Sequence, residues 1–240
     1  HAAGCILREG MRGMIRAGID TGGTFTDFVF YDGEKIYSYK IPSTPDDPSR
    51  SIISGLAHIL GDKFHNVEIV HGTTVATNAL LERKGARVAL VTTAGFEDVI
   101  EIGRQNRGSL YDIFWEASRP LVTRDMRLGV PERVSFEGKI LKKISGPDLK
   151  KLLTQLKKLK PQGVAISFLH SYKNPINEEK VASFLEQLGV PVSVSSRILP
   201  EFREYERTST VVANSYLVPK VRSYMKSLSE NISSRNGDGD

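Results

Sequence analysis

Short apolar runs alternate with stretches of helical period from residue 15 to residue 230 of this 240-residue chain. The apolar runs predict buried strands at residues 15–19, 67–70, 87–91, 163–168 and 190–194. Because amphipathic helical stretches separate them, most of these strands are expected to lie parallel. Two further runs, 25–31 and 35–41, are joined by the turn Asp32-Gly33 and predict an antiparallel hairpin. The sequence therefore predicts an α/β fold whose mixed sheet opens with a β-meander and has helices packed on it.

Capping signals mark the ends of the predicted helices. Asp47 followed by Pro48 predicts a helix start, and Gly61 predicts the end of the same helix. Thr74 is the expected cap of a helix over residues 75–83. Further helical stretches are predicted at 149–159, 174–189 and 207–230.

One domain is expected to occupy residues 14–230, with an irregular insertion at 103–138 that contains the only tryptophan and a segment, Leu128–Glu137, that resembles strands. Residues 1–13 are expected to be a leader before a natural start at Met14, and residues 231–240 a disordered polar tail. Pro219 should kink the last helix or split it in two, because proline removes a helical hydrogen bond.

The composition favours a folded globular chain and disfavours several other classes. Hydrophobic residues make up 40% and charged residues 25% of the sequence, which argues against intrinsic disorder. The net charge of +5 comes with lysines that gather on one helix and lack interleaved aromatic residues, so no nucleic-acid partner is expected. No apolar run reaches the roughly 20 residues of a membrane span, so no membrane partner is expected either. The single cysteine, Cys5, forms no intramolecular disulfide and fits a cytoplasmic location.

The segment 18–27, GIDTGGTFTD, follows the first strand and has the residue types of an anion-binding bend. Paired glycines let backbone amides approach a phosphate, and threonine hydroxyls add donors. The phosphate-binding candidates are Thr21, Gly22, Gly23 and Thr24. Asp20 is the candidate ligand of a hydrated Mg²⁺, and Asp27 is expected to support that site or orient a water. A plain hairpin turn would also explain the aspartates and glycines.

A second polar segment, HGTTVATN, links the strand at 67–70 to the following helix. Its candidates for binding an anion are Gly72, Thr73, Thr74 and Asn78, because a loop at the carboxyl end of a strand and before a helix favours anions. The alternative is that Thr74 only caps the helix. His71 is as compatible with a structural hydrogen bond as with a ligand role.

Other polar clusters are expected to be less important. Glu101, Arg104, Gln105 and Arg107 predict an exposed ion-pair face, whereas His170-Ser171 ends a strand and is a weaker candidate for the same crevice. The charged run 201–207 predicts a solvated helix start with i,i+3 and i,i+4 pairs. No HExxH or GxSxG motif occurs, which disfavours a zinc peptidase and a serine hydrolase.

Taken together, the segments resemble the N-terminal domain of the hydantoinase A/5-oxoprolinase family. The similar stretches are AGIDTGGTFTDFV (17–29), VHGTTVATNALLERKGARVALVTTAGFEDVIEIGRQ (70–105), PERV (131–134), AISFLHSY (165–172) and PEFREYERTSTVVANSYL (200–217). The resemblance implies an actin-like ATPase fold of the ribonuclease H-like type. It also implies ATP and Mg²⁺ as cofactors, and hydrolysis of a small cyclic amide coupled to phosphoryl transfer.

The resemblance leaves three functions open. The chain resembles the phosphate-binding lobe of a cyclic-amide hydrolase, but also subunits of acetone and acetophenone carboxylases, which phosphorylate a carbonyl substrate. A non-catalytic docking module is the third. Family members are longer, and no second Asp-Gly-Gly segment follows residue 217, so we expect a fragment or one half of a split enzyme. Such a chain needs a second lobe or companion subunit, and alone it should bind nucleotide weakly and turn nothing over.

Overall fold

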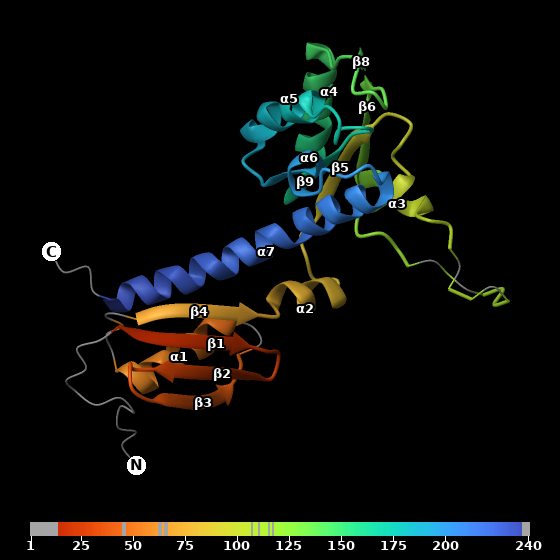
Figure 1. Ribbon diagram of the computed structural model, residues 1–240. Helices are drawn as coiled ribbons and strands as arrows, with labels where there is room; N and C mark the ends of the chain where they lie inside the picture. The colour runs from red at the N-terminus through yellow and green to blue at the C-terminus, as the bar shows by residue number, and fades with distance from the viewer. Residues whose placement is uncertain are drawn as a thin grey trace. The chain divides into compact units, whose positions relative to one another are not determined.

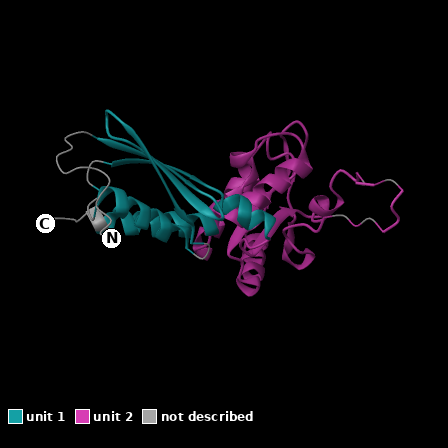
Figure 2. Ribbon diagram, turned by 90° about the horizontal axis from the view of Figure 1, so that it is seen from below, with its two compact units in different colours: residues 1–82, 220–240 teal, residues 83–219 magenta. Residues whose placement is uncertain are grey.

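The computed structural model describes residues 14–44, 47–61, 64, 67–106, 108–109, 111–114, 116 and 118–236. The chain forms two compact units (Figure 2). The first unit contains the described residues up to Glu82 and those from Lys220 onward, and the second contains Arg83–Pro219. The region that we expected to be one domain is therefore distributed over two units, each with its own sheet.

The first unit is built on a mixed four-stranded sheet in the order β3-β2-β1-β4 (Figure 1). Its strands are β1 (Ile15–Thr21), β2 (Phe25–Tyr31), β3 (Ile36–Pro42) and β4 (Val67–Thr73). The first three strands run antiparallel, and β4 lies parallel to β1. The predicted β-meander and mixed sheet are thus confirmed.

One face of this sheet is buried and the other is exposed, as the period of two along each strand requires. The buried face includes Ile19, Phe28 and Phe30, which pack with helix α1 (Pro48–Leu60). This helix has the predicted ends: the Asp47 side chain accepts a hydrogen bond from the Ser49 amide, and Gly61 follows with φ 78°. The short helix α2 (Val75–Leu81) follows β4.

The second unit contains a parallel four-stranded sheet in the order β10-β9-β5-β6. Its strands are β5 (Val88–Thr93), β6 (Arg127–Val130), β9 (Gly163–Ser167) and β10 (Val192–Val194). The other elements of the unit are α3 (Val99–Ile102), η1 (Arg124–Met126), β7 (Arg133–Val134), β8 (Ile140–Lys142), α4 (Gly146–Leu159), α5 (Ile176–Leu185), η2 (Glu186–Leu188) and α6 (Ser195–Ile198). The strands that we predicted to form one mostly parallel sheet therefore lie in two separate sheets, with β1 and β4 in the first unit and β5, β9 and β10 in the second. The later part of segment 103–138 is regular, because β6 joins the sheet beside β5.

The last helix, α7 (Glu204–Asn236), belongs to both units. Pro219 lies inside it, so of the two predicted outcomes, a kink or a split, the split does not occur. The helix also covers residues 231–236, which we had assigned to a disordered tail. Residues 1–13 and 237–240, together with Arg107 and Trp115, lie outside the described residues. Among the helices that the structure describes, none has the length and apolar character needed to cross a membrane.

Candidate functional site

The first predicted phosphate loop is a tight turn between β1 and β2. The Gly22 amide donates to the Phe25 carbonyl at 3.0 Å, which closes the turn around Gly23 and Thr24. A Cβ on Gly22 would lie 3.3 Å from that same carbonyl oxygen, so a larger residue would crowd the turn. Neither Gly22 nor Gly23 has a positive φ. Gly22 is therefore suited to this turn because it has no side chain to crowd the Phe25 carbonyl, and not because it adopts an unusual backbone conformation.

The second loop lies directly beside the first. The Thr74 amide donates to the Thr21 carbonyl at 3.2 Å, and its hydroxyl donates to the same oxygen at 3.3 Å. Thr74 therefore occupies the cap position of α2 without capping it through its side chain, which corrects that prediction. The Asn78 amide nitrogen donates to the Thr74 hydroxyl, and it lies 3.8 Å from the position of a Cβ on Gly23. The structure thus brings together the two loops that the sequence singled out.

Asp20 and Asp27 stand opposite each other in the β1–β2 ladder, both on the exposed face of the sheet. Asp27 pairs with Lys40 on β3 at 3.0 Å. Within the described part of the chain Asp20 makes no salt bridge, and its carboxylate lies 3.2 Å from where a Cβ on Gly72 would be. Facing carboxylates repel each other, so an additional cation beside Asp20 would be stabilising.

The described residues contain no cluster of three or more acidic, histidine or cysteine side chains able to hold a metal ion. Mg²⁺ commonly keeps several waters and is bound by one or two carboxylates plus substrate phosphates. A single accessible carboxylate beside a phosphate loop fits that pattern, so the residues present suit Mg²⁺ only together with a phosphate.

Thr21 and Thr73, which pair across β1 and β4, have side chains directed to the other face of the sheet from Asp20. The Thr21 hydroxyl is buried, whereas the Thr73 hydroxyl accepts a hydrogen bond from the Val75 amide at 3.2 Å. These two hydroxyls therefore do not lie beside the Asp20 carboxylate. On that side the loops offer Gly72 and the exposed residues Gly23 and Thr24 instead.

His71 has a structural partner that the sequence did not indicate. Its Nδ1 lies 3.2 Å from the Ile19 carbonyl oxygen and its Nε2 contacts the hydroxyl of Tyr224 on α7. Burial lowers the pKa of His71, although the Ile19 carbonyl and the charge of Asp20 act in the opposite direction. Burial also raises the pKa of Tyr224. A neutral imidazole that donates from Nδ1 and accepts at Nε2 joins α7 to the strand of the second loop.

The lowered pKa of His71 predicts that acidification destabilises the first unit. A histidine whose pKa is lower in the folded state stabilises the fold above its unfolded pKa of about 6.5, and this contribution is lost as the pH falls through the folded value. We expect the free energy of unfolding to fall between pH 7.5 and pH 5.5, with a slope below about 1.4 kcal/mol per pH unit for one proton. Amide hydrogen exchange of the first sheet at both pH values measures it. An unchanged pH dependence in His71→Gln would contradict this assignment.

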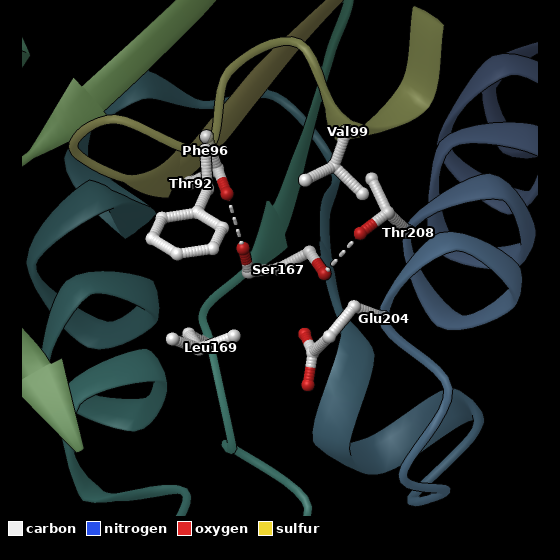
Figure 3. A pocket seen from close by; sticks show the side chains of 7 residues that line it. All are labelled: Thr92, Phe96, Val99, Ser167, Leu169, Glu204 and Thr208. Atoms are coloured by element: carbon white, nitrogen blue, oxygen red, sulfur yellow. Dashed lines mark hydrogen bonds between the residues drawn. The ribbon is translucent and has the colours of Figure 1, made fainter. Parts of the chain in front are cut away.

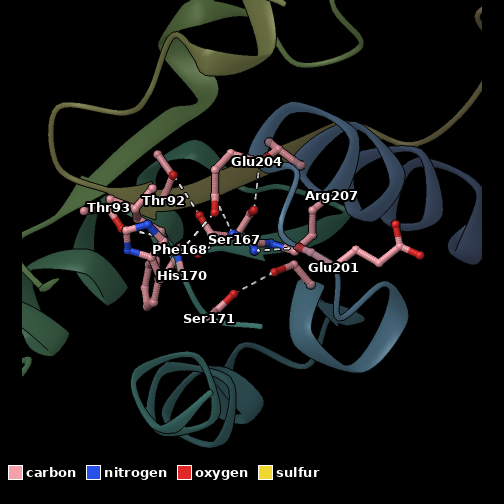
Figure 4. Close-up of polar contacts among 12 residues, drawn as sticks. Thr92, Thr93, Ser167, Phe168, His170, Ser171, Glu201, Glu204 and Arg207 are labelled. Carbon is pink, nitrogen blue, oxygen red and sulfur yellow. Dashed lines mark hydrogen bonds and ion pairs between the residues drawn. The ribbon is translucent and has the colours of Figure 1, made fainter. Parts of the chain in front are cut away.

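The second unit gathers polar side chains at the carboxyl ends of β5 and β9 (Figure 4). Arg207 is fully buried, pairs with Glu204, and donates to the carbonyls of Phe168 and Glu201. The prediction that 201–207 is only a solvated helix start was therefore wrong. The predicted ion-pair face is exposed at Glu101, Arg104 and Gln105, and Arg104 pairs with Glu206. Glu101 pairs at 2.6 Å with the guanidinium of Arg127, a buried residue that the prediction did not include.

His170 belongs to the second unit, whereas the two phosphate loops belong to the first. It has a φ of 59°, its amide donates to Glu204, and its Nδ1 lies 2.9 Å from the Val134 carbonyl oxygen. Ser171 lies 3.2 Å from the Ser195 hydroxyl. His170 therefore holds the loop after β9 in place.

Comparison with known proteins gives a consistent result. The sequence model of the hydantoinase/oxoprolinase N-terminal region matches residues 16–189. The chain is 36% identical over 224 residues to the caprolactamase subunit alpha of Pseudomonas jessenii, covering 88% of this chain and 32% of that one. It is 35% identical over 224 residues to the acetophenone carboxylase gamma subunit of Aromatoleum aromaticum, covering 83% and 30%.

A solved structure also resembles the whole fold. The ATP-dependent caprolactamase from Pseudomonas jessenii superimposes with a TM-score of 0.82 at 32% identity, over 94% of this chain and 34% of that one. The chain thus spans about a third of the length of these relatives.

Proposed function

The chain belongs to the hydantoinase/oxoprolinase N-terminal family, and from this premise we propose that its first unit holds the phosphates of ATP in an enzyme that opens a cyclic amide. Its α/β fold is of the actin-like ATPase type found in the structural relatives. The observation that supports the proposal best is the contact between the two loops, with Thr74 bonded to Thr21 and Asn78 beside Gly23.

The proposed chemistry follows from what these loops offer. An amide carbonyl is a poor electrophile, and transfer of the γ-phosphoryl group of ATP to the amide oxygen makes it a better one while ADP leaves. The Gly23 and Thr24 amides and the Asn78 side chain would position phosphate oxygens. Asp20 would hold Mg²⁺, which neutralises phosphate charge, and Asp27 would support it from across the ladder.

The remainder of the enzyme would come from a second lobe or a companion subunit, since the relatives are about three times longer. A small cyclic amide is the proposed substrate. The single cysteine fits a reducing, cytoplasmic setting for this enzyme.

The binding of Mg·ATP to the first unit is the direct test. We expect millimolar Mg·ATP to shift the backbone amide NMR signals of Gly22, Gly23 and Asn78. Asp20→Asn should weaken this binding about tenfold, which corresponds to about 1.4 kcal/mol, and should make it insensitive to Mg²⁺.

Glu68→Gln is the matched control. Glu68 is an exposed carboxylate on β4, on the same face of the sheet as Asp20, but it lies four residues before Gly72, the residue that pairs with Asp20. This control should bind like the parent chain. The absence of amide shifts at both loops, or equal weakening by the two substitutions, would contradict the proposal.

A second function is supported by the nearly equal identity to the acetophenone carboxylase subunit. In that case the phosphorylated substrate is a carbonyl compound and ATP use depends on bicarbonate. Measuring ATP hydrolysis by the completed enzyme with and without bicarbonate separates the two functions.

A further inference from the structure

The end of β3 lies against the first phosphate loop and adds a third segment to that site. The Ser43 amide donates to the Thr24 carbonyl at 2.9 Å, and the Ser43 hydroxyl donates to the Gly22 carbonyl at 2.9 Å. Both carbonyls belong to the turn 22–24, so the segment after β3 is hydrogen-bonded to the two ends of the loop. A side chain near the end of β3 can therefore reach a ligand of this loop.

One row of side chains crosses all four strands of the first sheet beside the two loops. Gly72 on β4, Asp20 on β1, Asp27 on β2 and Lys40 on β3 are successive register partners, and all four lie on the exposed face. Directly paired side chains are about 5 Å apart, so Lys40 lies two such steps from Asp20. Within this row Lys40 carries the only positive charge.

The Lys40 side chain extends across β2 toward the loop. Its Nζ lies 3.0 Å from Oδ1 of Asp27 and 5.2 Å from the ring centroid of Phe25, the residue directly after the turn. The Lys40 side chain is 57% exposed, so a phosphate can reach it from solvent. An ammonium group has three N–H donors, and one ion pair leaves donors for phosphate oxygens.

Charge explains why a cation is needed at this position. Asp20 and Asp27 face each other, and phosphate oxygens are negative as well, so the row would repel a nucleotide without a positive group. Two other cations of the first unit, Arg16 and Arg50, are paired with Glu68 and Asp47. Lysine commonly binds phosphate, and its long flexible stem can follow the ligand.

The polar crevice of the second unit does not suit a nucleotide. It lies at the carboxyl ends of β5 and β9, where Phe96, Leu169 and Glu204 line it (Figure 3). Its enclosed part has space for about one water molecule, whereas pockets for drug-sized ligands have roughly 300–1,000 Å³. The phosphate contacts are therefore sought on the exposed face of the first sheet.

We propose that Lys40 is a phosphate-binding residue and that Asp27 holds its ammonium group beside the first loop. In phosphoryl transfer the metal ion bridges the β- and γ-phosphates, so Lys40 contacts the phosphates that Mg²⁺ at Asp20 would neutralise. This inference rests on the proposed function for its ligand. It adds β3 to the two loops as a third segment of the site.

The direct test uses the whole 240-residue chain, Mg·ATP as the ligand and NMR as the readout. We expect Mg·ATP to shift the side-chain ε-methylene signals of Lys40 and to leave those of Lys35 unchanged. Lys35 is an exposed lysine just before β3, at the end of the strand away from the loop. Amide shifts at Gly22 and Gly23 without a shift at Lys40 would overturn this proposal and leave the phosphate loops standing.

Substitutions at the two lysines measure the contribution of the contact. Lys40→Gln should weaken the binding of Mg·ATP at least about tenfold, because a hydrogen bond to a charged group is lost. An exposed ion pair contributes little to stability, so this variant should fold. Lys35→Gln removes the same charge and should bind like the parent chain, and Lys40→Arg should retain most of the affinity because it keeps a cation. Equal binding by Lys40→Gln and Lys35→Gln would contradict the contact.

Lys40→Gln also leaves Asp27 without its partner, and a further pair of variants separates the two effects. Asp27→Asn keeps Lys40, whereas Asp27→Asn/Lys40→Gln has neither charge. The double variant should bind Mg·ATP at least about tenfold more weakly than Asp27→Asn alone. Equal binding by these two variants would mean that Lys40 only neutralises Asp27, and the proposal would be overturned. If Mg·ATP shifts no amide of either loop in the parent chain, the proposed function fails and the role of Lys40 fails with it.

Discussion

Arg207→Met should destabilise the second unit by about 3–5 kcal/mol, the cost of removing one partner from a buried ion pair. Arg207 is fully buried and donates to the carbonyls of Phe168 and Glu201 while it pairs with Glu204. Methionine fills similar space but leaves the Glu204 carboxylate without its cation and two carbonyl oxygens without their donor. Hydrogen exchange at Leu90 and Ile166, in the centre of the second sheet, measures the loss.

The matching controls separate charge from packing. Arg203→Met removes an exposed arginine from the segment just before α7 and should change the stability by less than about 0.5 kcal/mol. The double variant Glu204→Met/Arg207→Met removes both charges and should recover part of the loss, since paired apolar replacements are often neutral. A loss below about 1 kcal/mol in the single variant would mean that Arg207 does not hold the β9 loop.

The first unit was predicted almost completely from local signals. Asp47-Pro48, Gly61 and Asp32-Gly33 each specify a helix end or a turn within a few residues, and the structure has them where they were expected. The parallel arrangement of β1 and β4 agrees with the mostly parallel strands that the alternation of strands and helices predicted.

The second unit was less predictable because its structure depends on distant contacts. The strand-like pattern from Leu128 onward indicates a strand, but nothing within the short segment Arg127–Val130 indicates that it pairs with β5. The division of the strands between two sheets is likewise a choice of pairing partners that periodicity does not specify. Pro219 is accommodated inside α7, although proline usually breaks a helix.

Side-chain burial explains the errors at the two sites. The i,i+3 spacing of Glu204 and Arg207 correctly predicts pairing but carries no information on whether the pair is exposed. Tyr224 has no motif around it, so its contact with His71 was not predicted. Asp20 and Thr21 are neighbours in β1, and neighbouring side chains of a strand point to opposite faces of the sheet. The sequence alone therefore predicts that Thr21 points away from the face that carries Asp20.

Gly55→Ala should destabilise the first unit by about 2 kcal/mol, although alanine is the better helix former by roughly 0.8–1 kcal/mol. Gly55 lies in α1 over the ring of Phe28, and a Cβ there would lie 2.2 Å from the ring carbon Cζ. Phe28 is buried and stacks on Phe30 with ring centroids 6.0 Å apart, so it cannot move without disturbing the core. Overpacking a well-packed core costs typically about 1–3 kcal/mol beyond any gain in propensity.

Ser54→Ala is the matched control for the helix propensity, because Ser54 is the exposed neighbour in the same turn of α1. It should stabilise the unit by a few tenths of a kcal/mol, and Gly55→Ala should have the opposite sign. Hydrogen exchange at Ile19 and Phe30 measures both changes. A stabilising Gly55→Ala would show that α1 can move away from the sheet.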